Sequence, residues 1–284
     1  MRLGERVNSQ NTRFVRGPRG LLNELLWVAK TSLKIYFRYP AWLISDIIST
    51  PAWLVLLLFP VLMFLPKNQW NNPILLNSFF WAMILWDVVS SGLWGFGMAI
   101  RREQQTGTLE FLLLTNANRA LLFSRNIFPR LVSLSITILY TYFFFILLFN
   151  TGIILYEPLQ VTLLLLVSLL TAMGFGLVYG ALVLRFKNVG PLNNILQFLL
   201  LGISGIFYPI SSMPSWIQVA SLLVPFTYVA ELLRFHALRT PTLLPVALEW
   251  TILIASTLVL DVVGIVSLYA IEDRLKLTGE LSGY

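Results

Sequence analysis

The chain has 284 residues, of which 57% are hydrophobic and only 12% are charged, and its mean hydropathy is +0.77. Because so few polar side chains cannot cover a soluble globule of this size, the composition excludes an ordinary soluble protein and indicates a membrane protein. The absence of cysteine excludes disulfides and thiolate metal sites. The formal charge of +7 does not indicate a nucleic-acid partner, because the basic residues form no patch with interleaved aromatic side chains.

The N-terminal part of the chain is basic. Residues 1–20 carry five arginines, and we expect them to form a flexible cytoplasmic tail and not a signal peptide. Residues 21–39 place leucine and aromatic side chains on one helical face and polar residues such as Lys30, Lys34 and Arg38 on the other. This pattern predicts an amphipathic helix in the headgroup plane, with a cytosolic helix packed on a partner as the alternative.

Six apolar segments are long enough to cross a hydrocarbon layer of about 30 Å, which takes about 20 helical residues. They cover approximately residues 41–65, 73–100, 127–150, 159–184, 191–210 and 244–270. Within the first segment, Pro51 and Pro60 are expected to bend or interrupt the helix.

The stretch between the fifth and sixth segments is also apolar, but prolines and ionisable residues interrupt it. We therefore expect residues 211–240 to form two short re-entrant helices at the outer leaflet, and not a seventh span. Residues 271–284 are expected to form a second cytoplasmic tail. The predicted fold class is thus an all-α polytopic membrane protein with six transmembrane helices across residues 40–270.

The distribution of basic residues predicts the orientation. With the N-terminus inside, the predicted cytoplasmic pieces contain 17 of the 20 Lys and Arg residues, and only Lys67, Arg234 and Arg239 lie outside. Since cytoplasmic loops of membrane proteins carry the excess of Lys and Arg, both termini are predicted to be cytoplasmic. The predicted location is the cell membrane.

The stretch RREQQTGTLEFLLLT, residues 101–115, separates the second and third apolar segments and has a pattern of its own. Glu103 and Glu110 are expected to face water, Gly107 breaks the run, and Leu109 begins an apolar half. This pattern predicts a short helix along the cytoplasmic membrane face.

No residue pattern in the chain indicates covalent chemistry. The phosphate-binding motif G-x-x-x-x-G-K-[ST] does not occur, and His236 is the only histidine. We therefore expect no enzyme activity and no cofactor bound by this chain, so that any ATP would be bound by another subunit.

Two motifs resemble the permeases of type-2 ABC exporters. The first is Glu103-x-x-x-Gly107-Thr108-Leu109-Glu110 with the leucines that follow, which resembles the cytoplasmic coupling helix of that family. The second lies in residues 205–234, where a Tyr-Pro pair, Met-Pro-x-Trp and Pro-x-x-Tyr precede Glu-Leu-Leu-Arg. The amphipathic entry helix, the six spans and the short basic C-terminal tail are also similar, so the resemblance covers nearly the whole chain.

The resemblance implies a division of labour. ATP and Mg would be bound by separate ABC ATPase subunits, and a second permease, expected to make a homodimer, would complete the export pathway in the lipid membrane. The ATPase would dock on residues 101–115, called the coupling segment below, and on the loop that contains Arg185 and Lys187. Closure of the ATPase would switch the permease between inward-open and outward-open states. The implied docking residues are Glu103, Gly107, Thr108, Leu109, Glu110, Arg185 and Lys187. For Glu103, pairing with an ATPase arginine and capping of its own helix are both open.

The same resemblance implies that the second and fifth spans line the interface between the permeases. The candidate pathway residues are Trp86, Asp87, Trp94, Phe198, Phe207 and Tyr208. For the aromatic residues the alternative is ordinary packing or lipid contact. For Asp87 the alternatives are a polar pathway lining or ion relay and a hydrogen bond to a neighbouring Ser, Thr or Tyr.

The function predicted from these features is export of a hydrophobic or amphipathic small molecule or lipid, driven by ATP hydrolysis in partner subunits. A permease for lipid-linked polysaccharides is the alternative within the same family. An ion channel or ion-coupled carrier that works without ATP is the alternative of another class. A membrane-embedded enzyme is disfavoured, because no paired His, Cys or clustered carboxylates are evident in the sequence.

Overall fold

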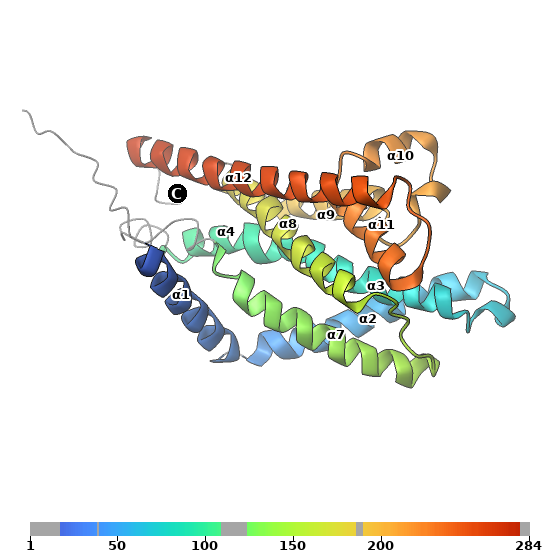
Figure 1. The fold of residues 1–284 in the computed structure, drawn as a ribbon. Helices are drawn as coiled ribbons and strands as arrows, with labels where there is room; N and C mark the ends of the chain where they lie inside the picture. Colours follow the sequence, from blue (N-terminus) through green and yellow to red (C-terminus); the bar gives the residue numbers. More distant parts are fainter. Residues whose placement is uncertain (1–17, 39, 109–123, 186–189, 279–284) are drawn as a thin grey trace, which may run out of the picture.

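The computed structural model describes residues 18–38, 40–108, 124–185 and 190–278 (Figure 1). No strand occurs in these ranges, which confirms the all-α prediction. In chain order the helices are α1 (Pro18–Arg38), α2 (Pro40–Phe64), α3 (Pro73–Ser90), the π-helix η2 (Ser91–Gly97), α4 (Met98–Gln105), α7 (Ile127–Phe149), α8 (Pro158–Arg185), α9 (Gly190–Ile203), α10 (Ser215–Ser221), α11 (Pro225–Leu238) and α12 (Val246–Thr278). Two short 3-10 helices, η1 (Lys67–Gln69) and η3 (Ile210–Ser212), lie in the connections.

Four helices of the described chain are long and apolar enough to cross a membrane: Pro73–Glu103, Ile127–Phe149, Pro158–Val183 and Val246–Ile271. The number is five if α10 and α11, which are bent by 100° relative to each other, count as one broken span. Val55–Phe64 and Pro191–Ile203 are shorter apolar helices. These helices indicate a multi-span membrane protein, and the count of six spans stays a prediction.

Several boundaries differ from the predicted ones. Helix α2 continues through both Pro51 and Pro60, so neither proline ends it. The fifth predicted segment, 191–210, is helical only to Ile203, because the chain turns at Gly205, whose φ of +65° lies in the left-handed region. Helix α12 extends to Thr278 and therefore enters the predicted C-terminal tail.

Helix α8 is the central element of the structure. It packs against α3, η2, α4, α11 and α12, and in Figure 1 it runs between α7 and α12. Small residues permit two of these close approaches: a Cβ at Gly176 would lie 2.3 Å from the carbonyl oxygen of Gly92 in η2, and one at Gly174 would lie 2.8 Å from the backbone nitrogen of Asp261 in α12. Small residues at helix contacts let backbones approach in this way.

Two hydrogen-bonded contacts between buried polar groups join these helices to their neighbours. The fully buried Asn77 of α3 donates to the carbonyl oxygens of Pro73 and Gly152, at 2.9 and 3.2 Å, and accepts from the Ile154 amide at 2.7 Å. The hydroxyls of Thr171 and Thr257 join α8 to α12 at 2.7 Å. Such bonds matter most where no water can replace a lost partner.

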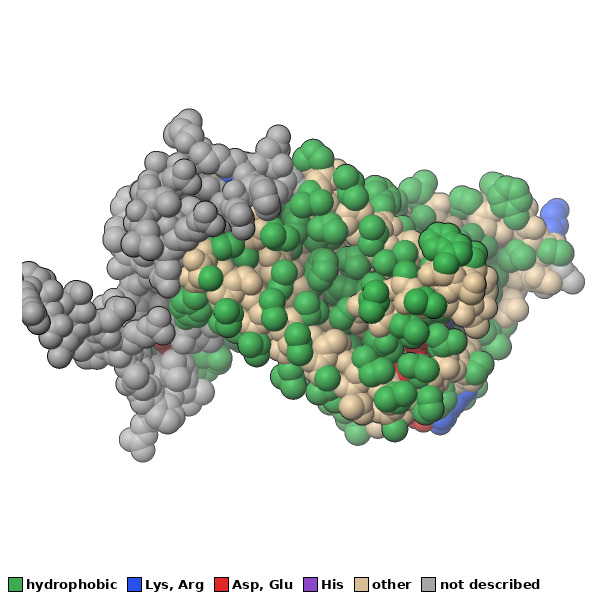
Figure 2. All heavy atoms as spheres, turned by 90° about the horizontal axis from the view of Figure 1, so that it is seen from above, with side chains coloured by type: hydrophobic (Ala, Val, Ile, Leu, Met, Phe, Trp, Pro, Cys, Tyr) green, Lys and Arg blue, Asp and Glu red, His purple; other side chains and the backbone are tan. Residues whose placement is uncertain are grey.

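The outer surface is largely apolar. Figure 2 shows that hydrophobic side chains cover most of the described part of one face and that few charged side chains interrupt them. A soluble monomer rarely exposes so continuous an apolar surface, so this face is suited to lipid or to another subunit.

Prediction for the α8 crossing: replacing Gly176 with Val will lower the thermal unfolding temperature of the detergent-purified protein. The new side chain would meet the backbone of Gly92, which cannot move aside as a flexible side chain would, and overpacking of this kind costs about 1–3 kcal/mol.

The matched control is Gly202→Ala in α9, where an added Cβ has no atom within 4 Å. This control is expected to be neutral or slightly stabilising, because alanine favours helix more than glycine does. Equal unfolding temperatures for the two variants would contradict the close crossing.

Candidate functional site

The helix that carries most of the candidate residues contains an irregular segment. It begins at Pro73, where the side chain of Asn72 accepts hydrogen bonds from the amides of Ile74 and Leu75 at 3.0 and 3.4 Å. It then passes through the seven-residue π-helix η2 before α4. Segments of π-helix are rare and often mark functional sites, and no pattern in the sequence predicted this one.

A chain of side-chain hydrogen bonds connects η2 to α9. The indole nitrogen of Trp94 donates to Gln197 Oε1 at 2.7 Å, and Gln197 Nε2 donates to the Ser90 hydroxyl at 3.1 Å. The Trp94 side chain is otherwise 44% exposed, and the next residue of α9 after Gln197, Phe198, is 66% exposed. The structure therefore brings Trp94 and α9 together through Gln197, a contact that sequence reasoning missed, and the pathway role of Trp94 and Phe198 stays a prediction.

The other candidate pathway residues separate into two groups. Tyr208 is exposed, like Trp94 and Phe198. Phe207 packs on Phe79, with ring centroids 6.0 Å apart, and Trp86 packs against the core. Trp86 and Phe207 are thus partly used for packing within the chain, whereas the three exposed rings are available for a ligand, for lipid or for another subunit.

Asp87 forms an ion pair with Arg130 of α7, and the same guanidinium donates to the Asp87 carbonyl oxygen at 2.7 Å. Neither interpretation of Asp87 made from the sequence included this partner. Opposite charges inside membrane segments usually pair, so an arginine near the start of the third predicted span was a signal that sequence reasoning could have used. The pair ties α7 to the helix that contains η2.

The described start of the coupling segment is held by Glu103. This carboxylate forms an ion pair with Arg125, in the turn that precedes α7, and accepts a hydrogen bond from the Thr108 hydroxyl. Thr106 donates to the carbonyl oxygen of Arg102 at 3.0 Å. Glu103 therefore has a cationic partner within its own chain, which sequence reasoning did not identify.

Gly107 provides the turn that ends this helix. Its φ is +69°, in the left-handed region that favours glycine, and an added Cβ would have no atom within 4 Å. The predicted tight break is therefore present, and its cause is backbone conformation and not crowding. Leu109, Glu110 and Lys187 lie outside the described residues, as does the side chain of Arg185, so their docking role stays a prediction.

The second motif builds a buried clamp. Arg234 Nη1 donates to the carbonyl oxygens of Gly205 and Ile206, at 2.7 and 3.2 Å, and Nη2 forms an ion pair with Glu231 at 2.7 Å. The second oxygen of Glu231 accepts from the Leu243 amide at 3.0 Å. The Glu-Leu-Leu-Arg motif thus joins the turn after α9, helix α11 and the connection to α12, and its role in this structure is architectural.

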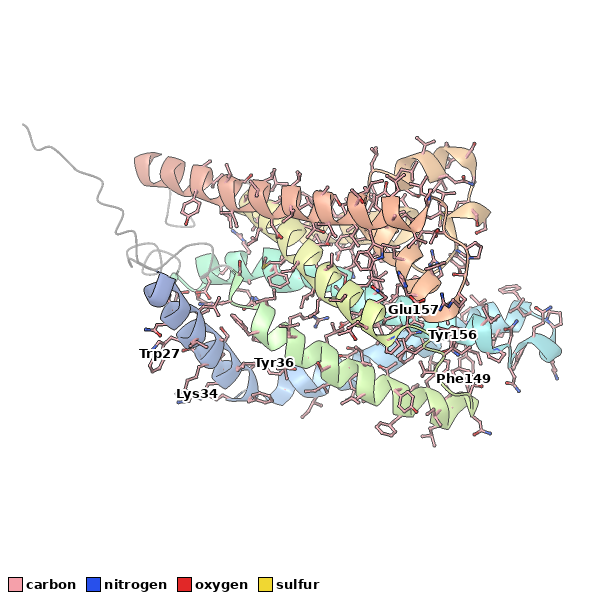
Figure 3. The ribbon with its side chains drawn as sticks, in the orientation of Figure 1. Trp27, Lys34, Tyr36, Phe149, Tyr156 and Glu157 are labelled. Carbon is pink, nitrogen blue, oxygen red and sulfur yellow. The ribbon has the colours of Figure 1, made fainter. Side chains whose placement is uncertain are left out.

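A second polar cluster lies where α8 begins. Figure 3 labels Glu157, which precedes α8; its carboxylate forms an ion pair with Arg239, directly after α11, and a hydrogen bond with His236 of α11. Trp250 Nε1 donates to His236 Nε2 at 3.2 Å, so the imidazole carries its proton on Nδ1 and donates it to Glu157. The lone histidine is therefore a buried bridge between α11, α12 and the start of α8.

The hydrogen bond from His236 is the main reason that the pKa of the Glu157 carboxyl lies below its usual value of 4.5; burial opposes the shift and the charge of Arg239 adds to it. A carboxyl with a lowered pKa stabilises the folded state above its unfolded pKa, and this stabilisation is lost as the pH falls through the folded pKa.

Prediction for this cluster: Glu157→Gln will lower the thermal unfolding temperature at pH 7, and the difference from the wild type will shrink below about pH 4.5 as the wild-type carboxyl becomes protonated. The measurement is thermal unfolding in detergent across this pH range. A difference that stays constant down to about pH 3 would contradict the role of the carboxylate charge.

Comparison with known proteins agrees with this architecture. The profile of the family described as ABC-2 type transporter matches residues 23–236, which is most of the chain. A protein of Cyanophora paradoxa named "Putative transport permease ycf38" is 29% identical over 243 residues, which cover 82% of this chain and 79% of that protein. The match includes the coupling segment, the helix with η2, and the clamp motif through Arg234. The chain belongs to the ABC-2 type transporter family.

Proposed function

We propose that this chain is the permease subunit of an ATP-driven exporter, and that it moves a hydrophobic or amphipathic small molecule or lipid out of the cytoplasm. The observation that carries the cargo class is the exposed aromatic surface next to a hydrogen-bonded glutamine. Trp94 and Phe198 offer exposed apolar rings, and the Gln197 amide is bonded to Trp94. A cargo with apolar and polar parts matches this combination.

The energy source in this proposal is a separate ATPase. Membership of the family implies ATPase partners in general, and the 284 residues contain no phosphate-binding motif of their own. ATP and Mg would therefore be bound by the partner subunits, and this chain would catalyse no covalent step.

The connection between ATPase and pathway would run through the Glu103 ion pair. Glu103 lies at the end of the helix that contains Trp94, and Arg125 lies in the turn that leads into α7. A force applied to the coupling segment would act on both helices at once, which the Asp87–Arg130 pair also joins. Differential binding of the ATPase to two arrangements of these helices would then drive alternating access.

A second permease, expected to be another copy of this chain, would cover the face that carries Trp94 and Phe198. In that arrangement the rings from both copies would enclose the cargo. Both termini would face the cytoplasm, in keeping with the distribution of Lys and Arg.

Prediction for coupling: Glu103→Lys will reduce transport while the partner ATPase continues to hydrolyse ATP, because two cations then face each other where an ion pair was. The double exchange Glu103→Arg with Arg125→Glu will restore transport. The measurement is ATP hydrolysis and transport of a panel of fluorescent lipids and drugs, with the co-purified ATPase in vesicles.

The exchange variant separates two roles of Glu103. Rescue supports a fastening inside the chain, whereas failure of the exchange with normal folding would contradict it and favour a direct contact between Glu103 and the ATPase. Fully coupled transport in the single variant would contradict both roles.

Prediction for the cargo face: Trp94→Ala will raise the cargo concentration needed for half-maximal transport about fivefold, since an aromatic contact contributes about 1 kcal/mol. Trp94→Phe keeps a ring but loses the bond to Gln197. Its half-saturating cargo concentration is expected to lie between those of the wild type and Trp94→Ala. The control is Trp216→Phe, in α10, which is expected to change nothing. Unchanged half-saturation in Trp94→Ala would show that this ring does not contact the cargo.

A further inference from the structure

A cavity of about 420 Å³ lies behind helix α1. It is open on one side and is lined by α1, by η2 and α4, and by the start of α7. Its lining residues are Ser32, Ile35, Tyr36, Ser91, Trp94, Gly95, Phe96, Ala99, Arg102, Glu103, Arg125, Asn126, Pro129, Arg130 and Ser133. The cavity therefore lies between the predicted interfacial helix and the ion pair that holds the coupling segment.

The walls of the cavity combine positive charge with apolar surface. Arg102, Arg125 and Arg130 contribute three guanidinium groups, against the carboxylate of Glu103 on the lining and that of Asp87 behind Arg130. The remaining walls are largely aliphatic or aromatic. A net positive cavity of mixed character is suited to an anion that carries an apolar part.

The guanidinium groups of the lining indicate which class of anion would bind. A guanidinium group donates in a planar fork that matches the oxygens of a phosphate, and arginine is favoured over lysine where such groups are bound. Arg102 and Arg125 repel each other electrostatically, and the Glu103 carboxylate, whose attraction for Arg102 is the larger of the two effects, already offsets this repulsion. An anion that takes the place of Glu103 would offset the same repulsion and accept hydrogen bonds from both guanidinium groups.

The position of α1 indicates where the anion comes from. Figure 3 shows Trp27 and Lys34 on the outer side of α1 and Tyr36 on the side toward α7. The outer surface of α1 exposes large apolar side chains, including Leu26, Trp27 and Phe37, and Lys30 lies over the Trp27 ring at 5.2 Å. Tryptophan and lysine side chains favour the boundary between acyl chains and headgroups, so α1 and the cavity behind it are suited to headgroup depth.

We propose that this cavity binds the phosphate group of an anionic phospholipid from the leaflet in which α1 lies. The phosphate contacts Arg102 and Arg125, and the start of the acyl chains lies against Ile35, which both lines the cavity and is exposed on α1. The lipid competes with Glu103 for Arg125 and thereby loosens the start of the coupling segment. Membrane composition would in this way regulate how firmly that segment is held.

The test is native mass spectrometry of the detergent-purified chain with dioctanoyl phosphatidylglycerol, compared with dioctanoyl phosphatidylcholine. We expect tighter binding of the anionic lipid, and about tenfold weaker binding of it in Arg125→Gln and in Arg102→Gln, because each variant loses a hydrogen bond between charged groups. Arg125→Lys keeps the charge without the planar fork. Its affinity for the anionic lipid is expected to lie between those of the wild type and Arg125→Gln.

The control is Arg239→Gln, which removes an exposed cation at the end of α11 and is expected to leave lipid binding unchanged. Thermal unfolding of each variant confirms that it is folded. Equal binding of the two lipids, or unchanged phosphatidylglycerol binding in both folded arginine variants, would overturn the proposal. Inorganic phosphate that binds as tightly as the lipid and displaces it would also overturn it, by showing that the occupant is the free anion.

This test measures lipid binding in the absence of ATPase subunits and of transport. The outcome is therefore independent of the export function proposed above.

Discussion

The structure depends on one constraint: a charged group among apolar helices is costly unless it has a partner. The ion pair of Asp87 with Arg130 meets this constraint between the helix that contains η2 and α7, and the Arg234 clamp meets it around α11. The Asp87–Arg130 pair holds α7 beside the helix that contains η2, and the bonds from Arg234 to Gly205 and Ile206 hold α11 against the turn after α9. The close crossings of α8 add its contacts with η2 and α12.

The close crossings connect α8 to helices on two sides. On one side, Gly176 brings α8 against η2, and on the other, Gly174 brings it against α12. The helix through η2 therefore contacts the centre of the molecule directly, while its end carries Glu103 and the turn at Gly107. A single helix in this way joins the cytoplasmic segment implied by the family, the exposed Trp94, and the packed core.

The π-helix η2 changes the direction in which the side chains after it point. A π-helix shifts the faces on which later side chains lie, so the segment changes register between the buried aromatic residues of α3 and the polar end of α4. Trp94 lies inside this segment, and its indole nitrogen donates a hydrogen bond to Gln197 of α9. The same segment lines the cavity behind α1, so the exposed Trp94 and a charged cavity share one stretch of backbone.

The sequence by itself determined the helical class, the apolar segments, the family motifs and the turn at Gly107, because each depends on residues close together in the chain. A long apolar run has essentially one backbone solution in a bilayer, and a glycine at a break in a polar run has few alternatives. Only the tertiary structure decided the partners: Arg130 bonds to Asp87 across 43 positions, and Trp94 to Gln197 across 103. No local periodicity encodes such pairs, since they arise only when helices that are distant in the sequence pack side by side.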